Sequence, residues 1–305
     1  MKSLAQFAMR GRSQAALLAA TGAVLSVLPV VGLFAALGSA AVVGLATLRQ
    51  GAAEGALLTV FAGIGGAVLA WLALGTPMPA VGFWLAFWLP VWVLAMVLGW
   101  SRSLSLTVQA AAMLGLIALA IAYLVSSTSG AAWQQVLEPV TQALLEADVI
   151  SAAEKPGLVA QLTSWMPALL AVTVYLMVLF SLFIARWWQA LLYNPGGFGA
   201  EFRALRIHPA VALLTIGFHL IAILSGAPWA TAMLVMVGML LLLQGLAVLH
   251  AVSVARRARP GWLIALYALF VLGFPLPQLA VAGLGLADVW ADWRRRIVQR
   301  GEDEP

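Results

Sequence analysis

Six long stretches of this chain contain no aspartate, glutamate, lysine or arginine. They cover residues 55–74, 81–100, 104–126, 164–185, 209–226 and 228–255. A helix of about 20 apolar residues is needed to cross the roughly 30 Å hydrocarbon core of a bilayer. The sequence therefore predicts an all-α, polytopic transmembrane helical bundle, with residues 1–305 forming a single integral membrane domain.

The composition supports this class and argues against several kinds of site. Hydrophobic residues make up 64% of the chain and charged residues only 9%, whereas about a quarter of a soluble domain is charged. With no cysteine and three histidines, we expect no metal centre and no cofactor. The net charge of +5 comes from arginines clustered beside apolar runs. This pattern is typical of contacts with the lipid bilayer, and we expect no nucleic acid partner.

Two further stretches, residues 13–48 and 260–287, are long for one crossing, short for two, and interrupted by proline. If both are hairpins, every lysine and arginine except Lys155 lies on one side of the membrane, which the positive-inside rule assigns to the cytoplasm. This predicts about 8–10 membrane segments, with both termini cytoplasmic. Residues 288–305 would form a cytoplasmic tail. End hairpins that are partly re-entrant are the alternative.

The segment 127–163 is then predicted to be an extracytoplasmic amphipathic loop. Four apolar residues fall along one helical stripe within it. They are Val136, Val140, Leu144 and Leu145. We interpret the segment as an amphipathic helix lying on the outer membrane surface, and a lid over a substrate mouth is the alternative.

The segment 193–207, "YNPGGFGAEFRALRI", separates two apolar stretches. It is not a nucleotide loop, because it lacks the third glycine of a dinucleotide fingerprint and the Lys-Ser or Lys-Thr of a Walker loop. We predict a turn and a short interfacial helix, with Phe198, Phe202 and Leu205 facing lipid. The alternative is a docking site for a cytoplasmic partner. Its charged residues would be Glu201, Arg203 and Arg206.

Three segments carry a resemblance to a known family. They read "WWQALLYNPGGFGAEFRALRI", "FHLIAILSGAPW" and "GLADVWADWRRR". With these segments the chain resembles, over nearly its whole length, the YybS-like family of predicted bacterial inner-membrane proteins, a domain family of unknown function. The resemblance implies a location in a bacterial inner membrane, and it implies no particular chemical activity.

Roughly the first 130 residues are also similar to the substrate-binding S components of energy-coupling-factor vitamin transporters. In that superfamily a first helix with small residues four apart packs against a transmembrane coupling subunit. Ala15, Ala19 and Ala23 have this spacing, which lets helix backbones approach closely. The resemblance implies a coupling subunit and a cytoplasmic ATPase as partners. Packing of the same face inside the chain is the alternative.

Few polar side chains fall within the predicted spans. His219 lies at about the depth of Thr173 and Tyr175, and Gln109 and Gln244 are further polar positions. Because an ionisable residue inside the membrane is a default site candidate, we take His219 as a ligand-binding residue, together with Thr173 and Tyr175 at its depth. The alternative is a histidine whose hydrogen bonds are satisfied inside the bundle.

Trp84, Trp88 and Trp92 recur every four residues on another predicted span. Such an aromatic stripe is able to stack against a planar ligand. Together with His219, Trp84 and Trp88 predict a ligand site in the outer half of the membrane. Simple packing of the tryptophans is the alternative.

Enzymatic activity is not expected. Neither a Gly-x-Ser-x-Gly elbow nor an HExxH motif occurs, and every carboxylate is expected at a surface. Two functions remain: a solute-binding or permease subunit that works with a cytoplasmic ATPase, and a non-transporting scaffold or envelope-assembly protein.

Overall fold

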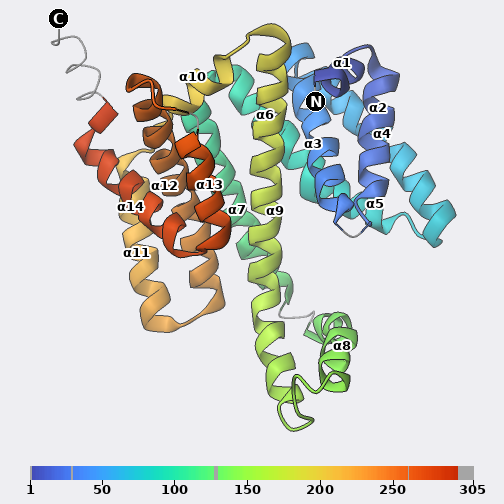
Figure 1. The fold of residues 1–305 in the computed structure, drawn as a ribbon. Coiled ribbons are helices and arrows are strands. Elements are labelled where there is room, and N and C mark those ends of the chain that lie inside the picture. The colour runs from blue at the N-terminus through green and yellow to red at the C-terminus, as the bar shows by residue number, and fades with distance from the viewer. Residues whose placement is uncertain (1, 29, 127–129, 260, 295–305) are drawn as a thin grey trace, which may run out of the picture. The chain divides into compact units, whose positions relative to one another are not determined.

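The computed structural model describes residues 2–28, 30–126, 130–259 and 261–294, and these residues form helices and no strand (Figure 1). Six helical segments in this part of the chain are long and apolar enough to cross a membrane. They are α3 (Val31–Gln50), α4 (Ala52–Leu74), the run of α5 (Met78–Phe83), η1 (Trp84–Trp88) and α6 (Leu89–Ser101), α7 (Leu104–Ser126), α9 (Lys155–Tyr193) and α12 (Pro228–Ala255). The predicted all-α fold with several apolar spans is confirmed.

The remaining helices are shorter. They are α1 (Lys2–Ala8), α2 (Arg12–Leu25), α8 (Gly130–Glu146), α10 (Gly197–Arg203), α11 (Pro209–Ser225), α13 (Gly261–Leu272) and α14 (Leu276–Ala291). The predicted span 209–226 corresponds to α11, whose 17 residues measure about 26 Å.

The chain divides into two compact units. Unit 1 comprises residues 1–111, 176–209 and 240–305, and unit 2 comprises residues 112–175 and 210–239. The division falls inside three long helices: after residue 111 of α7, after residue 175 of α9 and after residue 239 of α12. Each of these helices therefore contributes to both units.

In unit 1, the N-terminal stretch forms two helices, as the hairpin interpretation requires. Helix α2 has 14 residues and measures about 21 Å, less than a full span. Ala15 and Ala19 are 5% and 0% exposed, and the Ser39 hydroxyl of α3 donates to the Ala19 carbonyl at 2.6 Å. The small-residue face expected to dock a coupling subunit therefore packs inside the chain, and Ala23 at its end is only partly exposed.

The C-terminal stretch of unit 1 also forms two helices, α13 and α14. Helix α14 packs closely on α12, because a Cβ placed on Gly285 would lie 1.9 Å from the Leu241 carbonyl oxygen. The helix continues to Ala291, so the first four residues of the expected cytoplasmic tail are helical. Residues 295–305 of that tail lie outside the described residues.

In unit 2, the segment after α7 contains the predicted amphipathic helix, α8. Residues 127–129 lie outside the described part of the chain. The side of α8 turned toward the protein carries Leu137 and Thr141, whereas Val136 and Val140 are 60% and 56% exposed. The expected apolar stripe is thus split: its first half is exposed, and Leu144 and Leu145 are half-buried.

A short turn leads from α8 into α9. The Glu154 carboxylate accepts hydrogen bonds from the Ser151 amide at 2.8 Å and from the Ser151 hydroxyl at 2.7 Å. These bonds favour the ionised carboxylate and lower the pKa of Glu154. Lys155 then joins α9 to α8 through the Glu138 carboxylate at 2.7 Å.

The membrane orientation is open to a direct test, because the chain has no cysteine of its own. We expect single cysteines at Ala53 and Gly261 to resist impermeant thiol reagents in intact cells, and one at Ala147 to be labelled. All three positions are exposed, and all should label after the membrane is permeabilised. Labelling of Ala53→Cys in intact cells would show that the N-terminal hairpin has the opposite orientation in the membrane.

Candidate functional site

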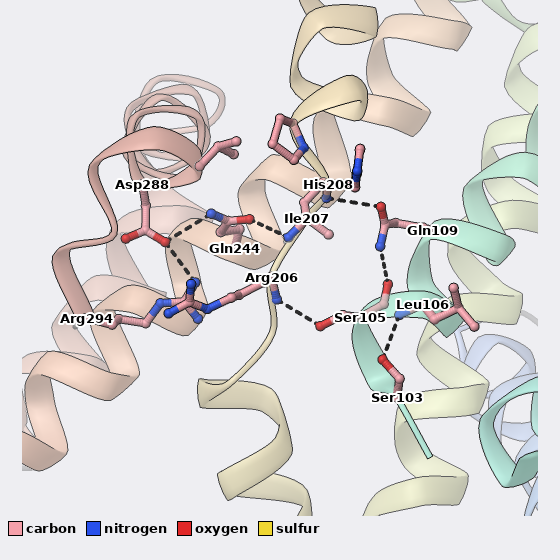
Figure 2. Close-up of a pocket in the computed structure, with 12 residues that line it drawn as sticks. Ser103, Ser105, Leu106, Gln109, Arg206, Ile207, His208, Gln244, Asp288 and Arg294 are labelled. Atoms are coloured by element: carbon pink, nitrogen blue, oxygen red, sulfur yellow. Dashed lines mark hydrogen bonds and ion pairs between the residues drawn. The ribbon is translucent and has the colours of Figure 1, made fainter. Parts of the chain in front are cut away.

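A polar region of unit 1 surrounds the chain between α10 and α11 (Figure 2). We call it the polar cluster and define it by side chains from α7, α12 and α14 that meet this linker. Its members are Ser105, Gln109, Arg206, Ile207, His208, Gln244, Asp288, Asp292 and Arg294.

The linker is irregular, and its residues alternate between buried and exposed. Leu205 and Ile207 are 0% and 4% exposed, and residues 205–208 have no regular secondary structure. Backbone amide and carbonyl groups in such a place need partners, since leaving a buried one unpaired costs about 1–3 kcal/mol.

Three side chains satisfy the linker's amides (Figure 2). The Arg206 amide donates to the Ser105 hydroxyl at 2.8 Å. The Ile207 amide donates to Gln244 Oε1 at 2.7 Å, and the His208 amide donates to Gln109 Oε1 at 3.2 Å. Each amide thus has an acceptor from a neighbouring helix, so α7 and α12 hold the linker in place.

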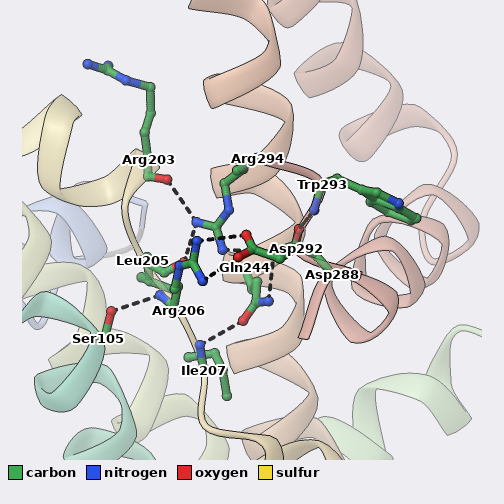
Figure 3. A network of polar contacts seen from close by, with 10 residues as sticks. All are labelled: Ser105, Arg203, Leu205, Arg206, Ile207, Gln244, Asp288, Asp292, Trp293 and Arg294. Carbon is green, nitrogen blue, oxygen red and sulfur yellow. Dashed lines mark hydrogen bonds and ion pairs between the residues drawn. The ribbon is translucent and has the colours of Figure 1, made fainter. Parts of the chain in front are cut away.

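Arg294 satisfies the carbonyl groups on the other side (Figure 3). Its Nη1 donates to the carbonyl oxygens of Arg203 at 2.9 Å and Leu205 at 2.7 Å. Its Nη2 donates to Asp288 Oδ2 at 2.8 Å. The guanidinium therefore joins the end of α10 to α14.

Asp288 is the acceptor at the centre of the cluster. Its carboxylate has no exposed surface, and it also accepts from Gln244 Nε2 and from the Trp293 amide, each at 3.0 Å. Our expectation that every carboxylate lies at a surface is wrong for Asp288. Burial is tolerated here because an ion pair and two further hydrogen bonds replace the water that the carboxylate loses.

A second ion pair lies at the edge of the cluster. Arg206 donates to both carboxylate oxygens of Asp292, at 3.0 and 2.7 Å (Figure 3). The two side chains are 57% and 29% exposed, so water screens this pair far more than the Asp288–Arg294 pair.

The cluster encloses a cavity of about 400 Å³, within the range of small-molecule sites. The charged residues that line it include Arg206, Asp288 and Arg294. Arg206 pairs with Asp292, and Arg294 pairs with Asp288. One buried donor, Arg294 Nε, has no partner among the described residues. The cavity is therefore polar but close to neutral.

The short helix predicted after the Gly-Gly turn is present as α10, but its apolar side faces the protein. The Phe198 and Phe202 rings lie 6.0 and 6.3 Å from the Phe183 ring of α9. Glu201 accepts from Arg186 Nε at 2.9 Å, and Leu205 is buried. The prediction of a lipid-facing side chain is thus wrong for Leu205, whereas Phe198 and Phe202 are half-buried against α9 and α12.

The expected tryptophan wall has a different role in the structure. Trp88 is 1% exposed and its indole N–H donates to the Ser39 hydroxyl at 2.9 Å, so no ring face is left for a ligand. Trp84 is half-buried and lies over Gly63 of α4. The packing alternative therefore describes Trp88.

The other predicted ligand residues belong to unit 2 and form no site there. His219 and Thr173 are exposed, whereas Tyr175 is buried, and its hydroxyl has no partner among the described residues. The buried residues of α11 are Ala212 and Thr215, in its first two turns, and the helix is exposed from His219 onward. His219 is thus not a histidine satisfied inside the bundle.

No family model matches this chain, and comparisons with curated proteins and with solved structures likewise return no match. Functional proposals therefore rest on the geometry of the polar cluster and on the sequence.

Proposed function

We propose that this chain is a membrane-embedded solute-binding or permease subunit, and that the cavity of the polar cluster holds its solute. One observation carries the proposal: a polar cavity adjoins a partly buried, non-helical linker between α10 and α11. Non-helical backbone inside a membrane protein is tolerated where it is buried in protein or lines a water-filled cavity.

The lining indicates the chemistry of the solute. Both arginines are paired with carboxylates, so a strongly charged solute would have to break an ion pair. Hydroxyl groups of Ser103 and Ser105 line the cavity and offer hydrogen bonds. These groups fit a small polar solute with little net charge.

The proposed assembly contains a transmembrane coupling subunit and a cytoplasmic ATPase in a bacterial inner membrane. Support comes from the resemblance to S components and to the YybS-like family. Since Ala15 and Ala19 are buried, we place the contact with these partners at the α10 region. Exposed Arg206 and half-buried Arg203 lie there.

A non-transporting scaffold or envelope-assembly protein is the second candidate. It is favoured by the hydrogen bonds of Gln109 and Gln244. Their side-chain amides bond to the linker and to neighbouring helices, so these bonds serve the fold rather than a solute. In that case the cluster would serve only to fix the α10 region for a partner.

A cavity-filling variant distinguishes the two functions. Leu106 lines the cavity, is 46% exposed and belongs to α7, so Leu106→Trp should fill the space without removing a hydrogen bond of the cluster. We expect one class among sugars, polyols, amino acids and water-soluble vitamins to stabilise the purified wild type, by about 2.7 kcal/mol at 100 times its Kd. Leu106→Trp should lose this stabilisation.

Ile117→Trp is the matched control, because Ile117 is 49% exposed on the same helix and does not line this cavity. It should respond to the solute as the wild type does. The tagged chain should also copurify from its native membrane with an ATP-binding-cassette ATPase. Absence of both solute stabilisation and ATPase would exclude the transport function and leave the scaffold.

A further inference from the structure

A second cavity of unit 1, of about 540 Å³, is lined mainly by aromatic and aliphatic side chains. We call it the aromatic groove. Helix α9 contributes Phe180, Phe183, Ile184 and Trp187, whose spacing of three, four and seven residues places them on one face of the helix. Helix α12 contributes Leu243 and Leu246 on the other side. The groove is therefore a continuous apolar surface between two long helices.

The short helix α10 covers one end of this groove. Phe198 and Phe202 contact Phe183, as described above, and the Phe202 ring lies 5.6 Å from the His250 ring of α12. Both ring nitrogens of His250 have hydrogen-bond partners. Nδ1 lies 2.8 Å from the Leu246 carbonyl oxygen, and Nε2 lies 3.3 Å from the Tyr267 hydroxyl. Its ring is part of the wall, with both nitrogens already bonded.

The groove runs from the end of the helices toward their middle. Trp187 is six residues, or about 9 Å, from the end of α9 at Tyr193, and Phe180 is about 20 Å from it. Since a single leaflet has roughly 15 Å of hydrocarbon, these side chains cover the depth from the headgroup region into the acyl chains.

Among the described residues that line the groove, Arg203 carries a full charge. Its Nη1 lies 3.1 Å from the position that a Cβ on Gly199 would occupy, so the guanidinium lies back along α10 at the mouth of the groove. The neighbouring acids have other partners: Glu201 pairs with Arg186, and Asp292 with Arg206. Within the described residues, the Arg203 guanidinium has no hydrogen-bond or ion-pair partner.

We propose that the aromatic groove binds an anionic phospholipid from the bilayer. One hydrocarbon chain lies against the α9 and α12 faces, and the phosphate group pairs with Arg203. Charge complementarity carries the choice of ligand, because an unpaired guanidinium at the mouth of an apolar groove matches a molecule with an anionic head and a hydrocarbon tail. The site is independent of the solute proposed for the polar cluster.

The test uses the purified full-length chain in a neutral detergent after removal of copurified lipid. Dioleoyl phosphatidylglycerol should bind at least about tenfold more tightly than dioleoyl phosphatidylcholine. Both lipids offer a phosphate to Arg203, but the quaternary ammonium of choline would bring a positive charge close to the guanidinium, and the glycerol head group would not. Binding is measured by native mass spectrometry and by the lipid-dependent melting temperature. Glycerol 3-phosphate, which has the phosphate without the chains, should not stabilise the protein.

Arg203→Gln should remove the preference for phosphatidylglycerol, whereas Arg203→Lys should keep most of it. Because the Arg203 side chain has no partner, the melting temperature without lipid should stay at the wild-type value. Arg256→Gln, at an exposed arginine just beyond α12, is the matched control for general surface charge and should keep the preference. Equal binding of the two lipids by the wild type, an undiminished preference in Arg203→Gln, or stabilisation by glycerol 3-phosphate alone would overturn the proposal.

Discussion

Asp288→Ala is expected to destabilise the folded protein by about 3–5 kcal/mol, the usual cost of removing one partner from a buried ion pair. The substitution leaves the Arg294 guanidinium, which is 9% exposed, without its carboxylate. It also removes the acceptor of Gln244 Nε2 and of the Trp293 amide. The free energy of unfolding is measured by denaturant titration in mixed micelles, with tryptophan fluorescence as the signal.

Arg206→Ala is the matched control, because it breaks the other ion pair of the same cluster. That pair is largely exposed, so its loss should cost only about 0–1 kcal/mol. The double variant Asp288→Ala, Arg294→Met should be more stable than Asp288→Ala, because it no longer buries an unpaired charge. If Asp288→Ala and Arg206→Ala lower the free energy of unfolding by similar amounts, then the Asp288 carboxylate is in contact with water rather than buried.

The fold class followed from the sequence because apolar length is a direct physical requirement for crossing a bilayer. Charge-free runs are visible residue by residue, and α4, α7, α9 and α12 contain the predicted spans. Which helix packs on which was not visible. Ala15 and Ala19 have a spacing that suits any close helix contact, and the structure pairs them with α3 of the same chain.

The polar cluster was only partly visible in the sequence. Gln109 and Gln244 stood out as polar residues in apolar runs, but their partners are the backbone amides of Ile207 and His208. Every residue type except proline has such an amide, so no sequence pattern marks it. Asp288 was missed for a related reason: the arginines that follow it suggested a hydrated tail, whereas Arg294 folds back onto it.

His219 shows the limit of reasoning from membrane depth alone. A polar residue within a predicted span is expected to face the bundle interior, yet α11 is buried only at Ala212 and Thr215. The direction of a side chain depends on where neighbouring helices end. That information is tertiary, and His219 lines neither the cavity of the polar cluster nor the aromatic groove.

Gly285→Ala is expected to destabilise the protein by about 3 kcal/mol or more, at or above the upper end of the usual range for overpacking. A Cβ at this position would lie 1.9 Å from the Leu241 carbonyl oxygen and 2.7 Å from the Gly245 amide nitrogen. These are backbone atoms of α12, so no side-chain rotation relieves the clash and the helices must separate.

Gly283→Ala on the same helix is the matched control. Nothing lies within 4 Å of its added Cβ, so the higher helix propensity of alanine should leave the protein as stable or stabilise it by up to about 1 kcal/mol. The two substitutions add the same methyl group two residues apart in α14, and unfolding of both in mixed micelles measures the difference.

Because Asp288 lies one turn beyond Gly285, a wider gap between α12 and α14 also stretches its bond to Gln244. Gly285→Ala should therefore weaken the polar cluster as well, and equal stability of the two variants would show that α14 does not pack on α12 through its glycines.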